Sequence, residues 1–252
     1  MPASVALPTL AWGSPASAHH ALLVHGLGSS GALMWRFGTA LAEAGWYAVA
    51  VDLRGHGLAP RALDYTIAAY AADVSQTVPD SGGAWDLVVG HSLGGASATL
   101  AAAEHPEWAR RLVLVDPALY LLPADRAVIE RSQQDAFDSP TIEEVRAAHP
   151  HWHPQDVELK AQAAQLASPW AIEQTLQQNP DWNVTDAAAR LAVPTHVIAS
   201  DPAVYSLFTG PHADAVLAGN ARITRSIVAG AGHSPHRDRP EATVTALCEA
   251  LA

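Results

Sequence analysis

Six short runs of apolar, strand-forming residues recur along this chain, and most are followed by a segment with helical character. All but the last are almost continuously apolar, which is typical of parallel strands covered on both faces. The runs are ALLVHG (21–26), WYAVAVD (46–52), WDLVVGH (85–91), RLVLVD (111–116), THVIAS (195–200) and ITRSIVA (223–229). Repeated strand–helix units imply right-handed crossovers, so the sequence predicts an α/β protein with a doubly wound, mostly parallel β-sheet flanked by helices.

The intervals between these runs predict the flanking helices. Helical segments are expected at 33–44, 66–78, 93–105 and 241–252. In a doubly wound sheet the loops at the carboxyl ends of the strands carry the functional residues. We therefore look for the site directly after the predicted strands.

One long stretch interrupts the alternation of strands and helices. Between residues 118 and 185 there is no strand candidate, and repeated prolines separate short amphipathic segments. Four helices are predicted there, at 125–135, 142–148, 156–167 and 170–177. We expect residues 1–117 and 186–252 to form the core and residues 118–185 to form a helical lid, called the cap below, over the carboxyl edge of the sheet.

Charge and composition exclude several classes of partner. The formal net charge is -11 and Lys160 is the only lysine, so neither nucleic acid nor an anionic membrane is an expected partner. No apolar run approaches the ~18 residues of a membrane span, and the N-terminus does not resemble a signal peptide. With the single cysteine, Cys248, no intrachain disulfide can form. We expect Cys248 to be buried and the protein to be cytoplasmic, while its oligomeric state stays open.

The strongest local motif is G-H-S-L-G at residues 90–94, which lies between a predicted strand and a predicted helix. A sharp strand-to-helix turn of this kind exposes its central side chain, and its flanking glycines relieve crowding. Ser92 is therefore the candidate nucleophile, at a helix N-terminus that favours negative charge. The alternative is an ordinary glycine-rich turn with a helix-capping serine.

A second glycine-rich loop, H-G-L-G-S-S-G at 25–31, follows the first predicted strand. Acyl transfer needs preorganised N–H donors for the oxyanion, and we expect them to come from the backbones of Leu27 and Leu93. Phosphate binding is the competing reading, but the loop lacks the P-loop lysine and the G-x-G-x-x-G spacing.

Taken together, HGLGSSG, DLRGHG (52–57), GHSLGG and GAGHSPHRDRP (230–240) resemble the successive signatures of the α/β-hydrolase family. This resemblance covers nearly the whole chain and is weakest over the cap. It implies the order nucleophile, acid, histidine. His233 matches the family's late histidine and would serve as the general base, with His236 as a neighbouring rival.

The resemblance implies an acid that orients His233. Asp201 follows the predicted strand at 195–200, where the family usually keeps this carboxylate, and it is preferred here. Asp116 is the alternative, since some members place the acid after the preceding strand. The family's acid loop often reads G-x-x-D, and the segment ASDPAVYS (199–206) has no such glycine.

These residues predict a serine hydrolase that cleaves a carboxylic ester or lactone through an acyl-enzyme, with no metal or organic cofactor. A carbon–carbon bond hydrolase or a cofactor-free perhydrolase would use the same residues, and a non-catalytic ligand-binding receptor is the alternative from another class. The apolar, tryptophan-bearing cap favours a hydrophobic or aromatic substrate over a sugar or a charged metabolite.

Several further residues are expected to contact the substrate. They are Gly26, Met34 and Trp35 near the first glycine-rich loop and Trp152, Trp170 and Trp182 in the cap. We expect at least one of the three cap tryptophans to line the pocket. The alternating histidines of HPHWHP (149–154) suggest a metal site, but no nearby cysteine or paired acids complete a coordination shell. We therefore expect no metal there.

Overall fold

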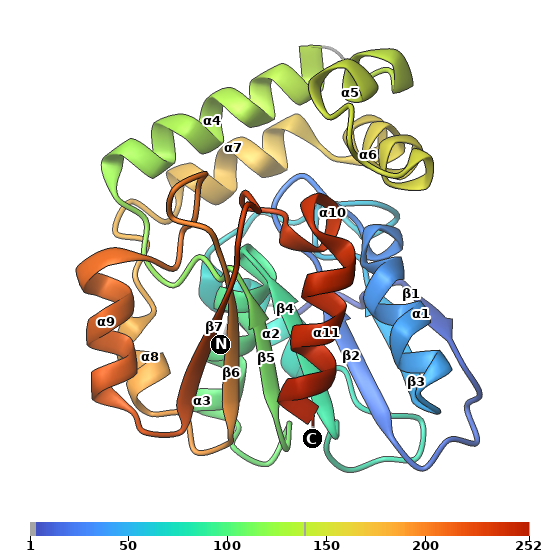
Figure 1. The fold of residues 1–252 in the computed structure, drawn as a ribbon, viewed down its shortest axis with the longest axis vertical. Helices are drawn as coiled ribbons and strands as arrows, with labels where there is room; N and C mark the ends of the chain where they lie inside the picture. The colour runs from blue at the N-terminus through green and yellow to red at the C-terminus, as the bar shows by residue number, and fades with distance from the viewer. Residues whose placement is uncertain (1–3, 139, 252) are drawn as a thin grey trace.

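The computed structural model describes residues 4–138 and 140–251, and these form one seven-stranded sheet with the order β1-β3-β2-β4-β5-β6-β7 (Figure 1). All six predicted strands are present. They are β2 (His20–Val24), β3 (Tyr47–Val51), β4 (Leu87–His91), β5 (Leu112–Val115), β6 (Thr195–Ser200) and β7 (Ile223–Val228). These six pair in parallel, which confirms the predicted α/β fold with a doubly wound, mostly parallel sheet.

The seventh strand, β1 (Thr9–Trp12), was not predicted. It pairs antiparallel with β3 at the edge of the sheet. Its residues alternate between exposed and half-buried, so it lacks the continuous apolar run that identifies the inner strands.

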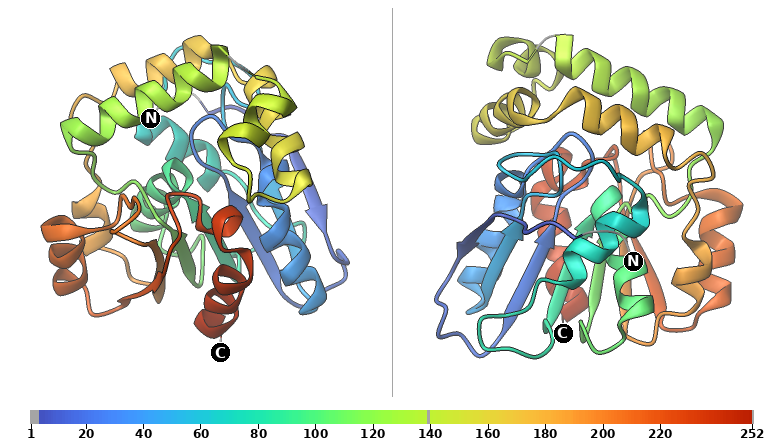
Figure 2. Two further views of the ribbon diagram at one scale, coloured as in Figure 1. Left: turned by 45° about the horizontal axis from the view of Figure 1, so that its top comes forward. Right: turned by 180° about the vertical axis from the view of Figure 1, so that it is seen from behind.

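Helices cover both faces of the sheet, as Figures 1 and 2 show from opposite sides. On one face lie α1 (Trp35–Glu43), which continues the short 3₁₀ helix η1 (Gly31–Met34), and α11 (Pro240–Leu251). On the other lie α2 (Ile67–Ser75), α3 (Leu93–Glu104), α8 (Thr185–Ala189) and α9 (Gly210–Gly219). Consecutive strand residues alternate between two apolar cores, with Leu22 in one and Leu23 in the other. This double burial explains why the inner strands are apolar throughout.

Of the helices between β5 and β6 in the sequence, four lie above the carboxyl edge of the sheet (Figures 1 and 2). They are α4 (Pro123–Asp138), α5 (Ile142–Ala148), α6 (Pro154–Leu166) and α7 (Pro169–Gln177). Their positions match the four predicted helices to within a few residues. Proline stands at the first position of α6 and α7, where its fixed φ suits a helix start and its missing N–H costs nothing.

Buried hydrogen bonds hold the cap to the core. The carboxylate of Asp156, fully buried on α6, accepts from Trp35 Nε1 at 2.8 Å and from Arg36 Nε and Nη2 at 3.0 and 2.8 Å. At the other end of the cap, the Asn179 side chain accepts from the Ile67 N–H at 2.9 Å and donates to the Tyr65 carbonyl at 3.0 Å. The cap is therefore fixed at both ends over the edge where the glycine-rich loops lie.

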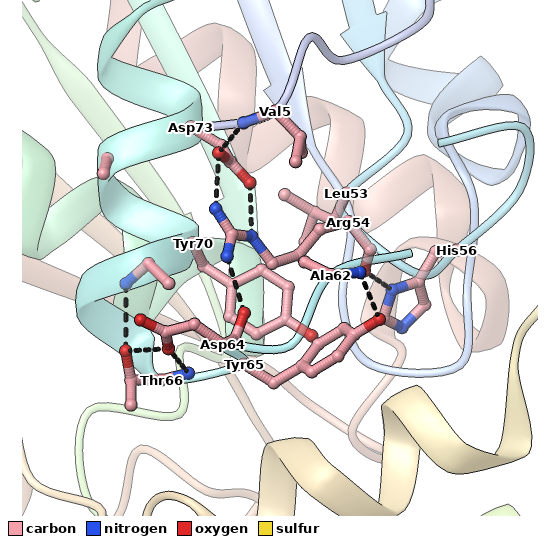
Figure 3. A network of polar contacts seen from close by, with 12 residues as sticks. Val5, Leu53, Arg54, His56, Ala62, Asp64, Tyr65, Thr66, Tyr70 and Asp73 are labelled. Carbon is pink, nitrogen blue, oxygen red and sulfur yellow. Dashed lines mark hydrogen bonds and ion pairs between the residues drawn. The ribbon is translucent and has the colours of Figure 1, made fainter. Parts of the chain in front are cut away.

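The loop after β3 is anchored by a buried ion pair (Figure 3). Arg54 Nε and Nη2 each donate to the Asp73 carboxylate at 2.6 Å, and neither side chain is exposed. Arg54 Nη1 also donates to the Asp64 carbonyl at 2.6 Å, and Asp73 accepts from the Val5 backbone N–H at 2.8 Å. This network ties the N-terminal segment, the β3 loop and α2 together.

Cys248 is exposed, so the expectation that it is buried was wrong. The buried residues of α11 are Thr243, Ala246 and Leu247, spaced three and four apart on one face of the helix. Cys248 falls outside that face. Within the described residues, no helix is both long and apolar enough to cross a membrane.

Candidate active site

Ser92 occupies a strained turn between β4 and α3. Its φ is 52° and its ψ is -117°, a conformation that L-residues rarely adopt and that is typical of functional sites. A Cβ at Gly90 would lie 2.7 Å from the Gly94 carbonyl oxygen, and one at Gly94 would overlap the Val24 carbonyl. The glycines of the motif are therefore required because backbone crowds the turn from both sides.

A continuous chain of hydrogen bonds runs from this serine. Ser92 Oγ donates to His233 Nε2 at 2.9 Å, and His233 Nδ1 donates to Asp116 Oδ2 at 2.7 Å. The three residues follow β4, β7 and β5 at the carboxyl edge of the sheet. A nucleophile, a base and an orienting acid thus lie within hydrogen-bond reach of one another.

Asp116 is held in place by several donors besides His233. It has a positive φ of 38° and is fully buried, and it accepts from Ser206 Oγ at 2.6 Å and from the Leu207 and Phe208 backbone N–H groups at 3.0 and 3.3 Å. Burial alone would raise the pKa of this carboxyl. The hydrogen bonds from His233, Ser206 and Leu207 outweigh burial and hold the pKa below its ordinary value.

The preference for Asp201 as the orienting acid was wrong, and the alternative, Asp116, lies beside the histidine. Asp201 Oδ2 accepts from the Gly230 N–H at 2.8 Å, and Oδ1 accepts from the Ala203 N–H at 2.9 Å. These two bonds lower the pKa of Asp201 and direct its carboxylate to the turn backbone rather than to His233. Asp201 therefore shapes a loop.

The two expected oxyanion donors lie on the same cavity as the serine. Leu93 is the first residue of α3, so its N–H has no carbonyl partner within the helix, and both Leu27 and Leu93 line the cavity that contains Ser92. Side chains fix the loop that carries Leu27. Gly28 N–H donates to His56 Nε2 at 3.1 Å, and Gly31 N–H donates to Asp52 Oδ1 at 2.8 Å.

The histidines behind this loop are buried and hydrogen-bonded as neutral rings. His56 Nε2 accepts from Gly28 while its Nδ1 donates to the Arg54 carbonyl. His25 Nε2 accepts from the Leu53 N–H at 3.0 Å while its Nδ1 donates to the Gly26 carbonyl. Burial lowers the pKa of His25 to about 4 and that of His56 to about 3. Protonation would turn each accepting nitrogen into a donor that faces an N–H.

Acidification is therefore expected to destabilise the fold well above the pH at which these rings titrate in the native state. In the unfolded chain each imidazole has a pKa of about 6.5, so below that pH the unfolded state binds protons that the native state excludes. The free energy of unfolding should fall by up to about 1.4 kcal/mol per pH unit for each such histidine between pH 6.5 and its native pKa. The contribution of these rings to the pH dependence fades as the pH rises from about 6.5 to about 7.5.

Thermal unfolding between pH 7.5 and 5 measures this effect. In His56→Gln the side-chain oxygen can accept from Gly28. Because this variant lacks one buried neutral imidazole, its unfolding should take up about one proton fewer over this range, so its stability should fall less as the pH is lowered. Equal slopes for the native protein and His56→Gln would contradict the assignment of His56 as a buried neutral ring.

A cavity of about 510 Å³ lies between the cap and the turn that carries Ser92, called the elbow from here on. It is lined by Ser92 and His233. One end is apolar and is formed largely by α4, α7 and the segment after β5, with Leu121, Val128, Ile129, Leu176 and Trp182. The other end carries Trp152, His149, Lys160 and Arg237. A small organic molecule can therefore reach the serine between two chemically different walls.

Two of the six expected substrate-contacting residues, Trp152 and Trp182, line this cavity, and the expectation for the other four was wrong. Met34 is fully buried in the core under α1. Trp35 is held by Asp156 in the cap attachment, and Trp170 is 43% exposed and packs on Tyr65.

Gly26, the fourth of these, sits against the elbow. A Cβ there would lie 2.9 Å from His91 Nδ1 and 3.0 Å from Ser92 Cβ. Gly26 thus lets the first glycine-rich loop approach the elbow closely, without contributing to the cavity wall itself.

Two of the three histidines of HPHWHP have structural partners, and His151 lines the cavity. His149 stacks on Trp152 with ring centroids 3.7 Å apart, and His153 Nδ1 accepts from the Gln155 N–H at the start of α6. The described part of the chain contains no group of three potential ligands that could hold a metal ion.

Sequence reasoning missed Lys160, Arg237 and Tyr205 as cavity-lining residues. Lys160 was noticed as the sole lysine, but only as a sign of low positive charge. Arg237 lies inside the late histidine motif that was used to identify His233. A solitary lysine on a helix above the site was the available signal.

Comparisons with known proteins bear on the family and the fold of the chain. A model described as "Alpha/beta hydrolase family" matches residues 21–246. A segment of the chain is 36% identical over 107 residues to a lipase, LipV, of Mycobacterium tuberculosis, covering 42% of this chain and 40% of the lipase. Another is 40% identical over 104 residues to a putative carbamate hydrolase, RutD, of Variovorax paradoxus, covering 40% of this chain and 39% of the relative.

The fold matches over a longer stretch than these alignments. The crystal structure of E-2-(acetamidomethylene)succinate hydrolase superposes with a TM-score of 0.84 over 97% of this chain and 94% of the other, at 22% identity. At 22% identity this match shows that the two proteins share a fold, and it shows nothing more. The two sequence relatives and this structural neighbour are all named as hydrolases, although the sequence matches span about two fifths of either relative.

Proposed function

This chain belongs to the alpha/beta hydrolase family, and on that premise we propose that it is a serine hydrolase that cleaves carboxylic esters or lactones of largely apolar small molecules. The observation that carries the proposal is the hydrogen-bonded series Ser92, His233 and Asp116, whose serine and histidine line the cavity beneath the cap. A non-catalytic receptor would have no need for a strained serine aligned with a base and an acid.

The reaction follows from the positions of these groups. Ser92 Oγ attacks the ester carbonyl carbon while His233 Nε2 accepts the hydroxyl proton, and Asp116 stabilises the resulting imidazolium. The tetrahedral oxyanion is bound by the Leu27 and Leu93 N–H groups. Collapse breaks the bond to the leaving alcohol, which receives the proton from His233. Water, deprotonated by the same histidine, then attacks the acyl-enzyme and releases the acid.

The apolar end of the cavity supports a hydrophobic substrate portion. Leu121, Leu176 and Trp182 are nearly fully buried where they line it, so an alkyl or aryl group there would be removed from water. A cleaved bond other than an ester is the main alternative. Carbon–carbon hydrolysis and perhydrolysis use the same three residues, and one relative is named a carbamate hydrolase.

A fluorophosphonate probe tests the proposal directly. Labelling of the native protein that is lost in Ser92→Ala and kept in Ser132→Ala, a serine that also lines the cavity, is the expected result. Hydrolysis of a panel of p-nitrophenyl esters and lactones should show the same dependence on Ser92. A native, folded protein that neither reacts with the probe nor hydrolyses any member of the panel would refute a catalytic role.

A further inference from the structure

Two cationic side chains line the cavity that contains Ser92. Lys160 comes from α6 in the cap, and Arg237 comes from the short helix α10 (Pro235–Asp238), which Figure 1 shows below α6. Lys160 Nζ donates to the Gly28 carbonyl at 2.8 Å, and Arg237 Nη2 lies 3.4 Å from Ser29 Oγ. Since Gly28 and Ser29 are adjacent, the two positive groups meet at one end of the cavity.

No carboxylate in the described residues forms an ion pair with either cation. Asp238, beside Arg237, already accepts from Trp152 Nε1 at 2.7 Å and from the Gly232 N–H at 2.9 Å. Asp156, the other acid near Arg237, is occupied by the cap attachment described above. Arg237 is only 5% exposed, and its Nε is buried without a hydrogen-bond partner.

Arg54, another buried arginine among the described residues, has a structural role and differs from Arg237 in its ion pairing. Arg54 meets Asp73 with two hydrogen bonds of 2.6 Å. Burying a charge without an anionic partner is costly. The Arg237 guanidinium lies over the Trp152 ring, 5.2 Å from its centroid, but it has no carboxylate partner, and a buried cation without a counter-ion at a cavity points to a function.

The electrostatics agree with this geometry. Burial lowers the pKa of Lys160 to about 8, and the charge on Arg237 acts in the same direction. Burial also lowers the pKa of Arg237 to about 10, against the opposing effect of Asp156 and Asp238. Both groups remain mainly protonated at pH 7, so this end of the cavity is positive.

We propose that Lys160 and Arg237 bind a carboxylate on the substrate while its ester carbonyl lies at Ser92. The guanidinium of Arg237, which lines the cavity, presents planar N–H donors that suit a carboxylate. The apolar end then holds the rest of the molecule. The substrate class becomes an ester that also carries a carboxylate, such as a half-ester of a dicarboxylic acid, in place of the uncharged molecule expected from sequence. This inference rests on the proposed hydrolase function.

Matched pairs of alkyl esters test the carboxylate site. Monomethyl succinate, glutarate and adipate each have a neutral dimethyl counterpart, and a pH-stat records hydrolysis of both. We expect the native protein to favour the half-ester of at least one chain length by about 10- to 100-fold in kcat/KM per ester group. Arg237→Met should remove that preference, because it raises KM for the half-ester more than for the diester; the ratio between the two esters is the quantity compared.

Lys160→Met is the second variant. Because Lys160 also holds Gly28, its loss will slow both esters, so the ratio between half-ester and diester is the informative quantity. Arg110→Met removes a positive charge from a surface pair with Asp86 and should preserve the ratio. Arg237→Lys keeps the charge and should retain part of the preference.

Two results would overturn the carboxylate site while leaving the hydrolase proposal intact. One is a native protein that hydrolyses the diesters as well as the half-esters of every chain length. The other is an Arg237→Met variant that slows both members of a pair equally, which indicates a structural role.

If no methyl ester is hydrolysed, calorimetric titration of Ser92→Ala with the same compounds tests the carboxylate site by binding alone, independently of hydrolysis. Binding of a half-ester at least about 10-fold tighter than its diester supports the site, and equal or absent binding refutes it.

Discussion

Asp116→Asn should lower kcat by about 10³- to 10⁴-fold, whereas Asp201→Asn should change kcat by no more than about 3-fold. In the native protein the Asp116 carboxylate accepts the proton on His233 Nδ1, which leaves Nε2 free to accept from Ser92. An asparagine amide can donate to Nδ1 instead. The proton then resides on Nε2, and the ring can no longer act as a base toward the serine.

Steady-state kinetics on one p-nitrophenyl ester compare the two variants directly. Asp116 also accepts from Ser206 and the Leu207 and Phe208 backbones, so circular dichroism and thermal unfolding must first establish that Asp116→Asn is folded. A folded Asp116→Asn with nearly native kcat, or a larger loss in Asp201→Asn, would disprove the role given to Asp116.

The sequence did not predict which of these two aspartates orients His233. Both follow inner parallel strands, and both precede a proline. What separates them is the path of residues 201–208, which bring the Ser206 hydroxyl and two backbone N–H groups onto Asp116 while Asp201 caps its own turn. Backbone donors of this kind leave no signature in residue type.

The nucleophile and the base were easier to predict because local physics constrains them. The glycines around Ser92 are required by backbone crowding, and the parallel strands before Ser92 and His233 fix both residues at the carboxyl edge of the sheet. The edge strand β1 was missed because it is half-exposed.

The cavity wall was harder to predict, since residue type does not indicate the direction of a side chain. Of the tryptophans considered, Trp152 and Trp182 face the cavity, while Trp35 and Trp170 face the cap attachment and Tyr65. Which face of a cap helix meets the core depends on tertiary contacts such as Asp156 with Arg36. The pair of cations at the cavity end arises in the same way, from residues 77 positions apart in the sequence, Lys160 and Arg237.

Arg54→Met should cost about 3–5 kcal/mol of unfolding free energy, because it leaves the fully buried Asp73 carboxylate without its charged partner. For a chain of this length that loss corresponds to a fall in Tm of about 6–20 °C. Arg110→Met is the matched control. Its side chain is 71% exposed where it pairs with Asp86, and removing a pair of this kind should cost less than about 1 kcal/mol.

The double variant Arg54→Met/Asp73→Leu separates loss of the pair from exposure of an unpaired charge. Removing both partners eliminates the buried carboxylate, so the double variant should be more stable than Arg54→Met alone. Recovery will be partial, because the Asp64 carbonyl and the Val5 N–H lose the partners shown in Figure 3. Chemical denaturation at pH 7 provides the comparison. A double variant less stable than Arg54→Met would mean that packing of the side chains, rather than charge compensation, is what Arg54 contributes to the fold.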